Sequence, residues 1–594
     1  MICVDMETTA IQGRPNYPPE PVGVAIKRPR RSAVYYAFGH PTGNNATREE
    51  AIAALRAAWA SGDGLLFHNA SFDLAVAMEK LGLPMPARER IHDTMIAAHL
   101  NDPYEPTFAL KPLAEKHLAM PPTERDAVRD WLVAEKVCRS DAKDWGAFIA
   151  FAPGDLVSPY ACGDVERTLQ LFDKLAPSGE AYDRERFLIP VLMENERQGI
   201  RVDTAALEDD AAKYDLAISE AEKWLRARLQ APELNFNSSG QLADALEAAK
   251  VVFEFATTAT GKRSTSKGTM TEDKFRDREV FLALGYRSRL QTCLSTFIHP
   301  WLETARQSSG RIFTRWRQLG AVTGRMSSSP NFQNMPKSWT DKPDGYEHPA
   351  FLGVPELPLL RRYILPDEGQ VLVACDYSGQ EVRVAAHFED GELLDGYRAN
   401  PEFDPHAVTA ATLKVLSGGT EYSRRTCKVG LFSTLYGAGG RKIAEQLGTD
   451  EATGALVKQA IFQAFPGIRA LDNELKQRGR EGKPFTTLGG RRYFAEPGKV
   501  VNGVAMDFTY KMLNTLVQGS SADQTKAALL RYDSCKKHGR LMLVVHDELV
   551  ISVPEEYALD EGATLSDCMV NALPIDTPML ADPSTPRATY AESK

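Results

Sequence analysis

The chain contains 594 residues, of which 43% are hydrophobic and 25% charged, and its 70 basic and 79 acidic side chains give a formal net charge of −9. This length exceeds what one hydrophobic core supports, so we expect roughly two to four domains, and the acidic balance argues against a surface coated with nucleic acid. The amino terminus lacks a basic start followed by an apolar run, which argues against secretion, and no stretch approaches 18 uncharged apolar residues, which argues against membrane insertion. The eight cysteines form no CxxC pair, which argues against a zinc site and a disulfide framework.

The pattern of apolar residues changes along the chain and divides it into regions. Residues 1–185 alternate short apolar runs with helical stretches, which predicts an α/β domain around a central sheet. Residues 186–300 are helical and charged, and predict an elongated helical subdomain. Beyond residue 300, the apolar strands QVLVACDYS and LMLVVHD bracket a helix-rich middle at about 404–480.

Acidic side chains recur beside the apolar elements of the first region. Asp5 and Glu7 alternate at the end of the first apolar run, so both can face one side of a strand. Asp73 follows in FHNASFDLA, while Tyr160 and Asp164 are four residues apart and would share one face of a helix. Four such acids could organise two metal ions, with Tyr160 orienting a water for hydrolysis. Each signal is weak alone, because acidic pairs at strand ends are common.

Two further carboxylates, Asp376 and Asp547, each stand where an apolar strand ends. In LMLVVHDELVISV, the triplet His546, Asp547 and Glu548 separates two apolar runs, which predicts two strands meeting at a tight turn. A metal site is one interpretation, because a carboxylate near a buried surface needs a cation, and an acidic hairpin turn is the other. Carboxylates on neighbouring strands can hold two divalent cations, as phosphoryl transfer requires.

The helix-rich middle carries a stripe of four side chains in RRTCKVGLFSTLYG. Arg424, Lys428, Phe432 and Tyr436 recur every four positions and therefore share one helix face. Such a face could hold a triphosphate at its cationic end and stack on a base at its aromatic end. A core-facing aromatic stripe with solvated cations is the alternative. Gly437 after Tyr436 predicts a helix that ends at a left-handed residue.

Basic residues gather in three short segments of this acidic chain. Such confined clusters could hold a polyanion in a cleft while the rest of the surface stays solvated, although surface charge without function is the alternative for any one of them. The clusters are Arg311, Arg315, Arg317 and Arg325; Arg424, Arg425 and Lys428; and Arg478, Arg480, Lys483, Arg491 and Arg492.

Taken together, these segments resemble a known family. The strand ending at Asp376, the helix from Arg424 to Gly437 and the triplet at His546 occur in the order and form of motifs A, B and C of family A DNA polymerases. Further matches are TGRMSSSPNFQNMP, FPGI, TTLGGRR and NTLVQGSSAD, and the resemblance covers most of the chain beyond residue 190. The amino-terminal acids resemble the exonuclease motifs of the DEDDy type found in the proofreading domain of these enzymes.

The resemblance implies a fold and a division of the chain. It implies an α/β multidomain protein, in which a ribonuclease H-like 3′→5′ exonuclease domain precedes a right-hand polymerase domain. The expected limits are 1–185 for the exonuclease domain and 186–594 for the polymerase domain, with a thumb at about 186–300, a palm at about 301–400 and 490–594, and fingers at about 401–489.

The resemblance also implies roles for individual residues of both sites. Metal ligands would be Asp376, Asp547 and the Tyr377 carbonyl in the polymerase site, with the acidic Glu548 beside them, and Asp5, Glu7, Asp73 and Asp164 in the exonuclease site with Tyr160. Nucleotide contacts would come from Arg424, Lys428, Phe432 and Tyr436, with Lys428 as an acid for the leaving pyrophosphate and Glu381 excluding a ribose 2′-hydroxyl. DNA contacts would come from Arg325, Asn514, Gln518 and His546.

The expected activity is extension of a DNA primer on a template with deoxynucleoside triphosphates, together with 3′→5′ proofreading of a single-stranded end. Two Mg²⁺ ions are expected in each active site, with Mn²⁺ as an alternative. We expect a cytoplasmic monomer without a membrane partner, whose replisome partners would be a helicase and a single-strand-binding protein. Because the exonuclease motif starts at Asp5 and residues 186–300 leave no room for a large insertion, a compact enzyme replicating a phage genome in its host's cytoplasm is expected.

The chain departs from the family pattern at Gly379, Gln380, Leu431, Ser433 and Tyr510, which puts fidelity and primer grip in question rather than activity. Three other functions are alternatives. A single-subunit RNA polymerase is opposed by Glu381, by Glu548 and by the exonuclease motifs. A stand-alone nuclease would leave residues 186–594 without a role, and a silent nucleic-acid-binding protein would not need intact acids in both sites.

Overall fold

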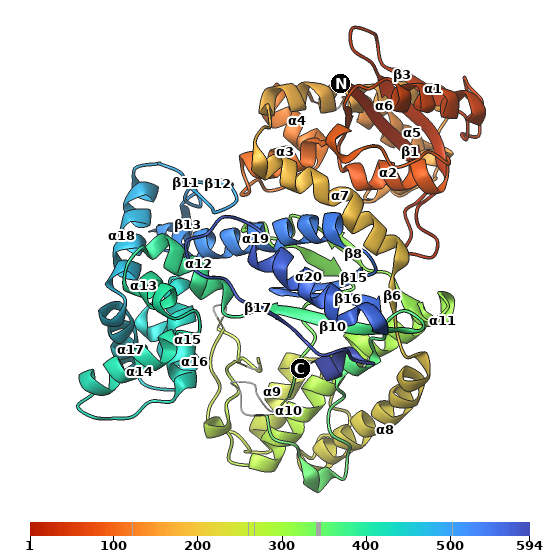
Figure 1. The fold of residues 1–594 in the computed structure, drawn as a ribbon. Helices are drawn as coiled ribbons and strands as arrows, with labels where there is room; N and C mark the ends of the chain where they lie inside the picture. The colour runs from red at the N-terminus through yellow and green to blue at the C-terminus, as the bar shows by residue number, and fades with distance from the viewer. Residues whose placement is uncertain (122, 259–260, 267, 340–345, 502, 594) are drawn as a thin grey trace.

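The computed structural model describes residues 1–121, 123–258, 261–266, 268–339, 346–501 and 503–593. Its amino-terminal part is an α/β domain with a five-stranded sheet in the order β3-β2-β1-β4-β5, seen at the top of Figure 1. Strands β1 and β2 are antiparallel, whereas β1, β4 and β5 run parallel. The strands are β1 (Ile2–Thr8), β2 (Pro21–Lys27), β3 (Val34–Ala37), β4 (Leu65–Phe67) and β5 (Ile91–Asp93).

Helices cover this sheet, and its β-branched and aromatic side chains form one core with them. Local signals define the helix ends. Thr47 caps α1 in a capping box, in which Thr47 and the side chain of Glu50 each accept a backbone N–H, and Asp93 caps α3 by accepting two backbone N–H bonds. The helices are α1 (Arg48–Ala60), α2 (Ala70–Glu79), α3 (Thr94–Asn101), α4 (Leu110–Leu118), α5 (Thr123–Ala134) and α6 (Gly154–Leu175).

One long helix, α7 (Glu180–Gln198), leads from the amino-terminal domain to the rest of the chain (Figure 1). The predicted domain boundary at residue 185 therefore falls inside a continuous helix. The predicted helical subdomain follows, and its far end carries a separate hydrophobic core. It contains α8 (Thr204–Arg228), α9 (Ser239–Ala248), α10 (Arg278–Thr292) and α11 (His299–Gln307).

A second sheet lies in the centre of the molecule, in the order β15-β16-β10-β17. The predicted hairpin is present: β15 (Arg540–Val545) and β16 (Glu548–Pro554) are antiparallel and joined at a two-residue turn. The strand QVLVACDY is β10 (Gln370–Tyr377), which pairs with β16 on one side and with β17 (Ala581–Pro583) on the other. Apolar residues of the sheet pack against α19 (Met512–Cys535) and α20 (Ala558–Val570).

The helix-rich middle forms a body of its own to one side of this sheet, with a hydrophobic core built around α15 and α17. Two small hairpins follow it, β11 (Phe485–Thr486) with β12 (Arg492–Tyr493), and β13 (Lys499–Val501) with β14 (Val504–Met506). The helices are α12 (Gln380–Glu389), α13 (Glu392–Ala399), α14 (Pro405–Leu416), α15 (Arg424–Leu435), α16 (Gly440–Leu447), α17 (Glu451–Ala464) and α18 (Pro466–Arg480).

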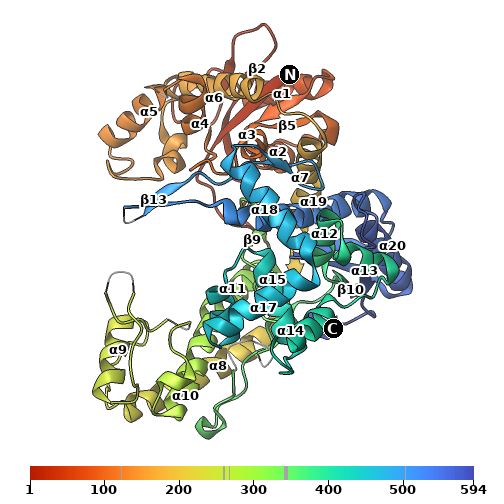
Figure 2. The same cartoon turned by 90° about the vertical axis from the view of Figure 1, so that its left-hand side faces the viewer.

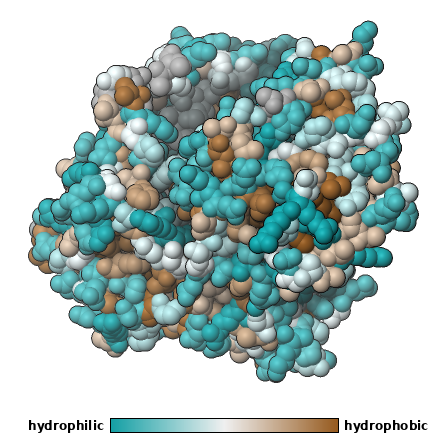
Figure 3. All heavy atoms as spheres, turned by 90° about the horizontal axis from the view of Figure 1, so that it is seen from above, coloured by the Kyte–Doolittle hydropathy of each residue, from teal (hydrophilic) through white to brown (hydrophobic). Residues whose placement is uncertain are grey.

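The surface seen from the amino-terminal end is mainly hydrophilic, and hydrophobic residues occur there in small separate groups (Figure 3). Within the described ranges, no helix combines the length and the apolar character needed to span a bilayer. The fold matches the predicted α/β, multidomain architecture.

Candidate functional sites

The central sheet brings the predicted carboxylates to one end. Asp376 is near the end of β10 and lies opposite Glu548 of β16 in the strand register. Asp547 is in the β15–β16 turn, and its backbone carbonyl accepts a hydrogen bond of 3.3 Å from the Tyr377 N–H. The preceding residue, His546, has a φ of 60°, so the turn is tight and left-handed there. Segments 171 residues apart in the chain thus meet at one sheet edge.

The electrostatics of this edge favour a bound cation. Burial, followed by the nearby negative charge of Asp376, raises the pKa of Asp547 to about 6. The Oε1 atom of Glu548 is buried without a hydrogen-bond partner among the described residues. Carboxylates crowded in this way lose mutual repulsion when a divalent cation binds. The donor set therefore fits a divalent metal ion.

Two residues that carry no sequence motif, Tyr590 and Arg361, contact the Glu548 carboxylate. The Tyr590 hydroxyl donates a 2.9 Å hydrogen bond to Glu548 Oε2, and the Arg361 guanidinium lies 3.5 Å from the same oxygen. Arg361 also stacks over the Tyr590 ring at 4.3 Å. Both partners come from segments without a motif, so only tertiary packing reveals them. They fix one oxygen of Glu548, and its other oxygen, Oε1, has no hydrogen-bond partner among the described residues.

Lys337 also reaches these acids. Its ammonium lies 3.9 Å from Asp376 Oδ2 and 3.7 Å from Glu548 Oε2, while its side chain stays 53% exposed. The positive charge of Lys337 also lowers the pKa of Asp547 against the upward shift caused by burial. Lys337 directly follows the matched stretch PNFQNMP, and that position was the signal that could have found it.

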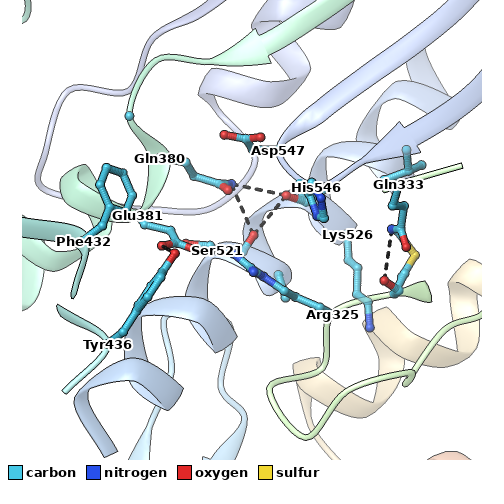
Figure 4. Close-up of a pocket in the computed structure, with 15 residues that line it drawn as sticks. Arg325, Gln333, Gln380, Glu381, Phe432, Tyr436, Ser521, Lys526, His546 and Asp547 are labelled. Carbon is cyan, nitrogen blue, oxygen red and sulfur yellow. Dashed lines mark hydrogen bonds and ion pairs between the residues drawn. The ribbon is translucent and has the colours of Figure 1, made fainter. Parts of the chain in front are cut away.

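A pocket of about 290 Å³ opens beside Asp547, lined by residues of α12, α15, α19 and the β15–β16 turn (Figure 4). Glu381 of α12 accepts a 2.6 Å hydrogen bond from the Tyr436 hydroxyl and pairs with Arg325 through its other oxygen. Burial and the Glu381 carboxylate raise the pKa of Tyr436 above its usual value. The Phe432 ring meets Tyr436 edge to face at 6.2 Å. Figure 4 shows Phe432, Tyr436 and Glu381 on one side of the pocket, and Arg325 and His546 on the other.

The predicted stripe on α15 is present. The helix begins at Arg424, with Ser423 as its cap, and Tyr436 closes it just before Gly437, whose φ is +77°. Arg424 is exposed and pairs with Asp404 at 2.7 Å, at an end where backbone N–H groups favour an anion. The aromatic end reaches the pocket, and the cationic end lies two turns away along the same face. An anion bound there would have to compete with Asp404 for Arg424.

The predicted DNA contacts are divided between the pocket and α19. Arg325 and His546 line the pocket. Asn514 and Gln518 are four residues apart on α19 and so share a face. A hydrogen bond with the Gln518 side chain lowers the pKa of Tyr436, against the larger upward effect of burial. Asn514 Oδ1 is buried without a hydrogen-bond partner in the described part of the chain.

One basic cluster was misread. Arg491 is buried and paired with Glu185 of α7 and Asp523 of α19, so it cannot meet a polyanion in a cleft. The prediction for this residue is wrong because its partners come from distant segments. The neighbours Arg480 and Lys483 remain exposed.

The amino-terminal acids form a second site. Asp5 and Glu7 of β1 and Asp164 of α6 have carboxylate oxygens within 4.8 Å of one another, close enough to hold a metal ion. Burial, followed by the negative charge of Asp164, raises the pKa of Asp5 to about 7. Burial also raises the pKa of Glu7 well above its usual range. Such a cluster stores repulsion that a divalent cation removes.

Asp73 and Tyr160 lie next to this cluster. Asp73 of α2 accepts a 2.9 Å hydrogen bond from the Met6 N–H, and burial, followed by Asp5, raises its pKa. Asp73 is a neighbour of the close group rather than part of it. Lys111 of α4 donates hydrogen bonds to the Tyr160 hydroxyl at 2.9 Å and to Asp164 at 2.5 Å. No sequence signal pointed to Lys111.

Comparisons with known proteins identify the family of the chain. Residues 204–589 match the family model for DNA polymerase family A, and residues 1–180 match a 3'-5' exonuclease model. The fold resembles that of the "POL domain of Pol1 from M. smegmatis complex with DNA primer-template and dNTP", with a TM-score of 0.76, 21% identity and coverage of 100% of this chain and 95% of that one.

Bacterial relatives show the same relationship in sequence. The thermostable DNA polymerase I of Thermus filiformis is 32% identical over 66% of this chain and 46% of its own length. DNA polymerase I of Chloroflexus aurantiacus is 28% identical over 92% of this chain and 57% of its own, and that of Pseudomonas aeruginosa is 27% identical over 98% and 62%. The chain thus spans about half to three fifths of these relatives. It belongs to DNA polymerase family A and carries a 3'-5' exonuclease domain in its amino-terminal part.

Proposed function

We propose that this chain is a template-directed DNA polymerase, which extends a DNA primer 5′→3′ with deoxynucleoside triphosphates and trims 3′ ends with its amino-terminal domain. The observation that carries the proposal is the meeting of Asp376 and Asp547 at the edge of the central sheet, beside a pocket that the aromatic end of α15 lines. Phosphoryl transfer requires this combination of clustered carboxylates, cations and a surface for a base.

In the polymerase site, Asp376, Asp547 and the Tyr377 carbonyl would hold two Mg²⁺ ions, with Mn²⁺ as an alternative. When bound, the metal ions would polarise the attacking and leaving oxygens. Glu548, fixed by Tyr590 and Arg361, would keep the sheet edge negative. These assignments rest on the register of β10 and β16 and on the raised pKa of Asp547.

The nucleotide would lie along α15. Arg424 and Lys428 would bind its phosphates, and Lys428 would donate a proton to the leaving pyrophosphate. Phe432 and Tyr436 would support the base pair. Glu381, which Arg325 and the Tyr436 hydroxyl hold in place, would exclude a ribose 2′-hydroxyl and so select deoxynucleotides.

The DNA would contact the remaining predicted residues. Arg325, Asn514, Gln518 and His546 would touch the primer terminus and the template. In this assignment the thumb, palm and fingers correspond to the helical subdomain, the central sheet with α19 and α20, and the helix-rich middle.

The amino-terminal site would hydrolyse a single-stranded 3′ end as a DEDDy exonuclease. Asp5, Glu7 and Asp164, with Asp73 beside them, would hold its metal ions. Tyr160 would orient the attacking water, and its hydrogen bond from Lys111 would set the position of the hydroxyl.

The wider biological setting stays a prediction. The relatives named above are bacterial, so replication of a phage genome has no support from them. A cytoplasmic monomer that works with a helicase and a single-strand-binding protein is likewise a prediction.

Substitution of one acid in each site tests the proposed function. Asp547→Ala should abolish primer extension and leave degradation of single-stranded DNA, whereas Asp5→Ala should do the reverse. Asp582→Ala is a matched control, because Asp582 faces Asp376 from β17 in the same register and is not a proposed ligand. Primer extension by Asp547→Ala at the wild-type rate would contradict the polymerase assignment, and unchanged 3′ trimming by Asp5→Ala would contradict the exonuclease assignment.

A further inference from the structure

The hairpin of β13 and β14 projects away from the body of the protein. Val500 pairs with Ala505 across the two strands, and Figure 2 shows the hairpin reaching out below the amino-terminal domain, on the same side of the molecule as α9. A two-stranded hairpin of this length is marginally stable on its own. The described residues 492–501 and 503–511, which include the two strands of the hairpin and its two stems, are called the arm below.

The stems of the arm adjoin both the end of α15 and the amino-terminal domain. On one side, Gly437 at the end of α15 lies so close to the Tyr510 carbonyl that a Cβ at position 437 would come within 2.3 Å of it. On the other side, burial and the nearby carboxylate of Glu496 raise the pKa of Tyr104, in the amino-terminal domain, to about 12. Tyr104 also contacts Thr515, at the start of α19. The arm therefore leaves the body where the polymerase site and the exonuclease domain adjoin.

The side chains of the arm are unusual for a solvated hairpin. Val500 is 74% exposed, and Phe494, Met506 and Tyr510 are also exposed. Cations accompany these apolar groups: the Arg492 guanidinium lies 5.4 Å from the centre of the Phe494 ring, and Lys511 lies 4.4 Å from that of Phe508. Lys499 is exposed on β13. Exposed rings interleaved with cations suit unpaired bases and their phosphates, because every base has a face that can stack.

The charge of the arm favours the same ligand. Arg480, at the exposed end of α18, lies next to the arm and pairs with Asp507 at 3.9 Å, whereas the exposed Lys483 pairs with Glu481 at 2.8 Å. Glu496 takes up part of the positive charge by pairing with Lys511 at 2.6 Å and with Lys499 at 3.6 Å. With Arg480, the cations Arg492, Lys499 and Lys511 outnumber the carboxylates Glu496 and Asp507 by four to two, so this region is positive in a chain whose net charge is −9, which favours contact with a polyanion.

We propose that the arm binds the unpaired 3′ end of the primer and guides it from the polymerase site to the exonuclease site. The proposal rests on the proposed polymerase and exonuclease activities. Matched primer ends, which stay paired in the polymerase site, do not need the arm. Mismatched ends, which fray, would be captured by its exposed side chains.

The test compares three rates in one set of variants. In the double variant Phe494→Ala/Val500→Ser, degradation of a mismatched primer on its template should fall ~5-fold or more, the effect of losing about one base-stacking contact. A variant with two glycines in place of residues 499–506, which removes the exposed Val500 and Met506, should slow the same reaction. Degradation of single-stranded oligonucleotides and extension of matched primers should stay within about twofold of wild type. Val415→Ser is the matched control, because Val415 is equally exposed, at 76%, but lies on α14.

Several outcomes would overturn the proposal. One is wild-type degradation of mismatched primers by both arm variants. Another is an equal loss of single-strand degradation, which would place the effect in the exonuclease site. A third is weaker binding of matched duplex DNA by the arm variants, which would show that the arm binds paired rather than unpaired DNA. If the wild-type protein itself neither extends primers nor degrades 3′ ends, the result would instead contradict the proposed function. The double variant keeps the test decisive if the shortened one fails to fold.

Discussion

A buried ionic cluster joins α7 to the central sheet domain, and we expect it to carry much of the stability of that junction. Glu185 of α7 is fully buried and accepts hydrogen bonds of 2.8 and 2.9 Å from Lys526, besides pairing with Arg491. Asp523, also fully buried, pairs with Arg491 and, at 2.7 Å, with Arg184. The charges thus alternate across residues from three distant segments.

The change Glu185→Gln removes one negative charge and keeps the shape of the side chain. In this variant Arg491 still pairs with Asp523. Lys526 then faces the neutral amide of residue 185 and the Gln318 carbonyl, which lies 2.9 Å from its ammonium. Breaking a buried pair costs about 3–5 kcal/mol, and each lost charged hydrogen bond costs about 1.5–3 kcal/mol. Because the amide oxygen can still accept one bond, we expect the free energy of unfolding to fall by about 3 kcal/mol.

The matched control is Glu194→Gln on the same helix. The Glu194 side chain is 45% exposed and pairs with Arg197 one turn away at 2.9 Å, an arrangement that contributes about 0–1 kcal/mol. Urea unfolding, followed by circular dichroism and tryptophan fluorescence, would measure both variants. The transition that reports on the α7 junction should shift for Glu185→Gln and stay near wild type for Glu194→Gln. Equal shifts would refute the reasoning, because they would show that burial of this cluster adds nothing.

Three further predictions concern the polymerase site. Glu381→Ala should raise ribonucleotide incorporation in a primer-extension assay by opening the space beside Tyr436, and an unchanged sugar preference would remove its gating role. Lys337→Met should strengthen Mn²⁺ binding, measured by electron paramagnetic resonance in an Asp5→Ala background, because it removes a cation 3.9 Å from the proposed ligand Asp376 and 3.7 Å from the neighbouring Glu548; unchanged or weaker binding would contradict this. Gly437→Ala should lower the thermal midpoint, because the residue has a φ of +77° and its new Cβ would clash with the Tyr510 carbonyl; a midpoint equal to that of wild type would contradict this.

Local periodicity explains what could be predicted from the sequence. The α15 stripe follows from a spacing of four residues, and the β15–β16 hairpin follows from two apolar runs around an acidic triplet. The meeting of Asp376 and Asp547 could be predicted because both strands end in the same way. In each case the signal lies within one short segment.

The residues that were missed depend on tertiary contacts. Lys111, Arg361 and Tyr590 belong to no repeating pattern, and each reaches its acid only because separate elements pack together. Arg491 was misread because Glu185, which neutralises it, lies 306 residues away. The β13–β14 hairpin differs from these residues, because its sequence VVNGVA contains Asn-Gly, a local signal that favours a hairpin turn.

In both acidic sites a lysine lies beside the carboxylates, and the two lysines differ in their burial and hydrogen bonding. Each site places a lysine beside buried carboxylates, which lowers their repulsion before any metal ion binds. Lys111 is largely buried and hydrogen-bonded to Asp164 and Tyr160, so its ammonium is a fixed part of the amino-terminal site. Lys337 is half exposed and stays 3.7–3.9 Å from its acids, beyond hydrogen-bond length. The Lys337 ammonium therefore acts on Asp376 and Glu548 through its charge, whereas displacement of Lys111 would also release Tyr160.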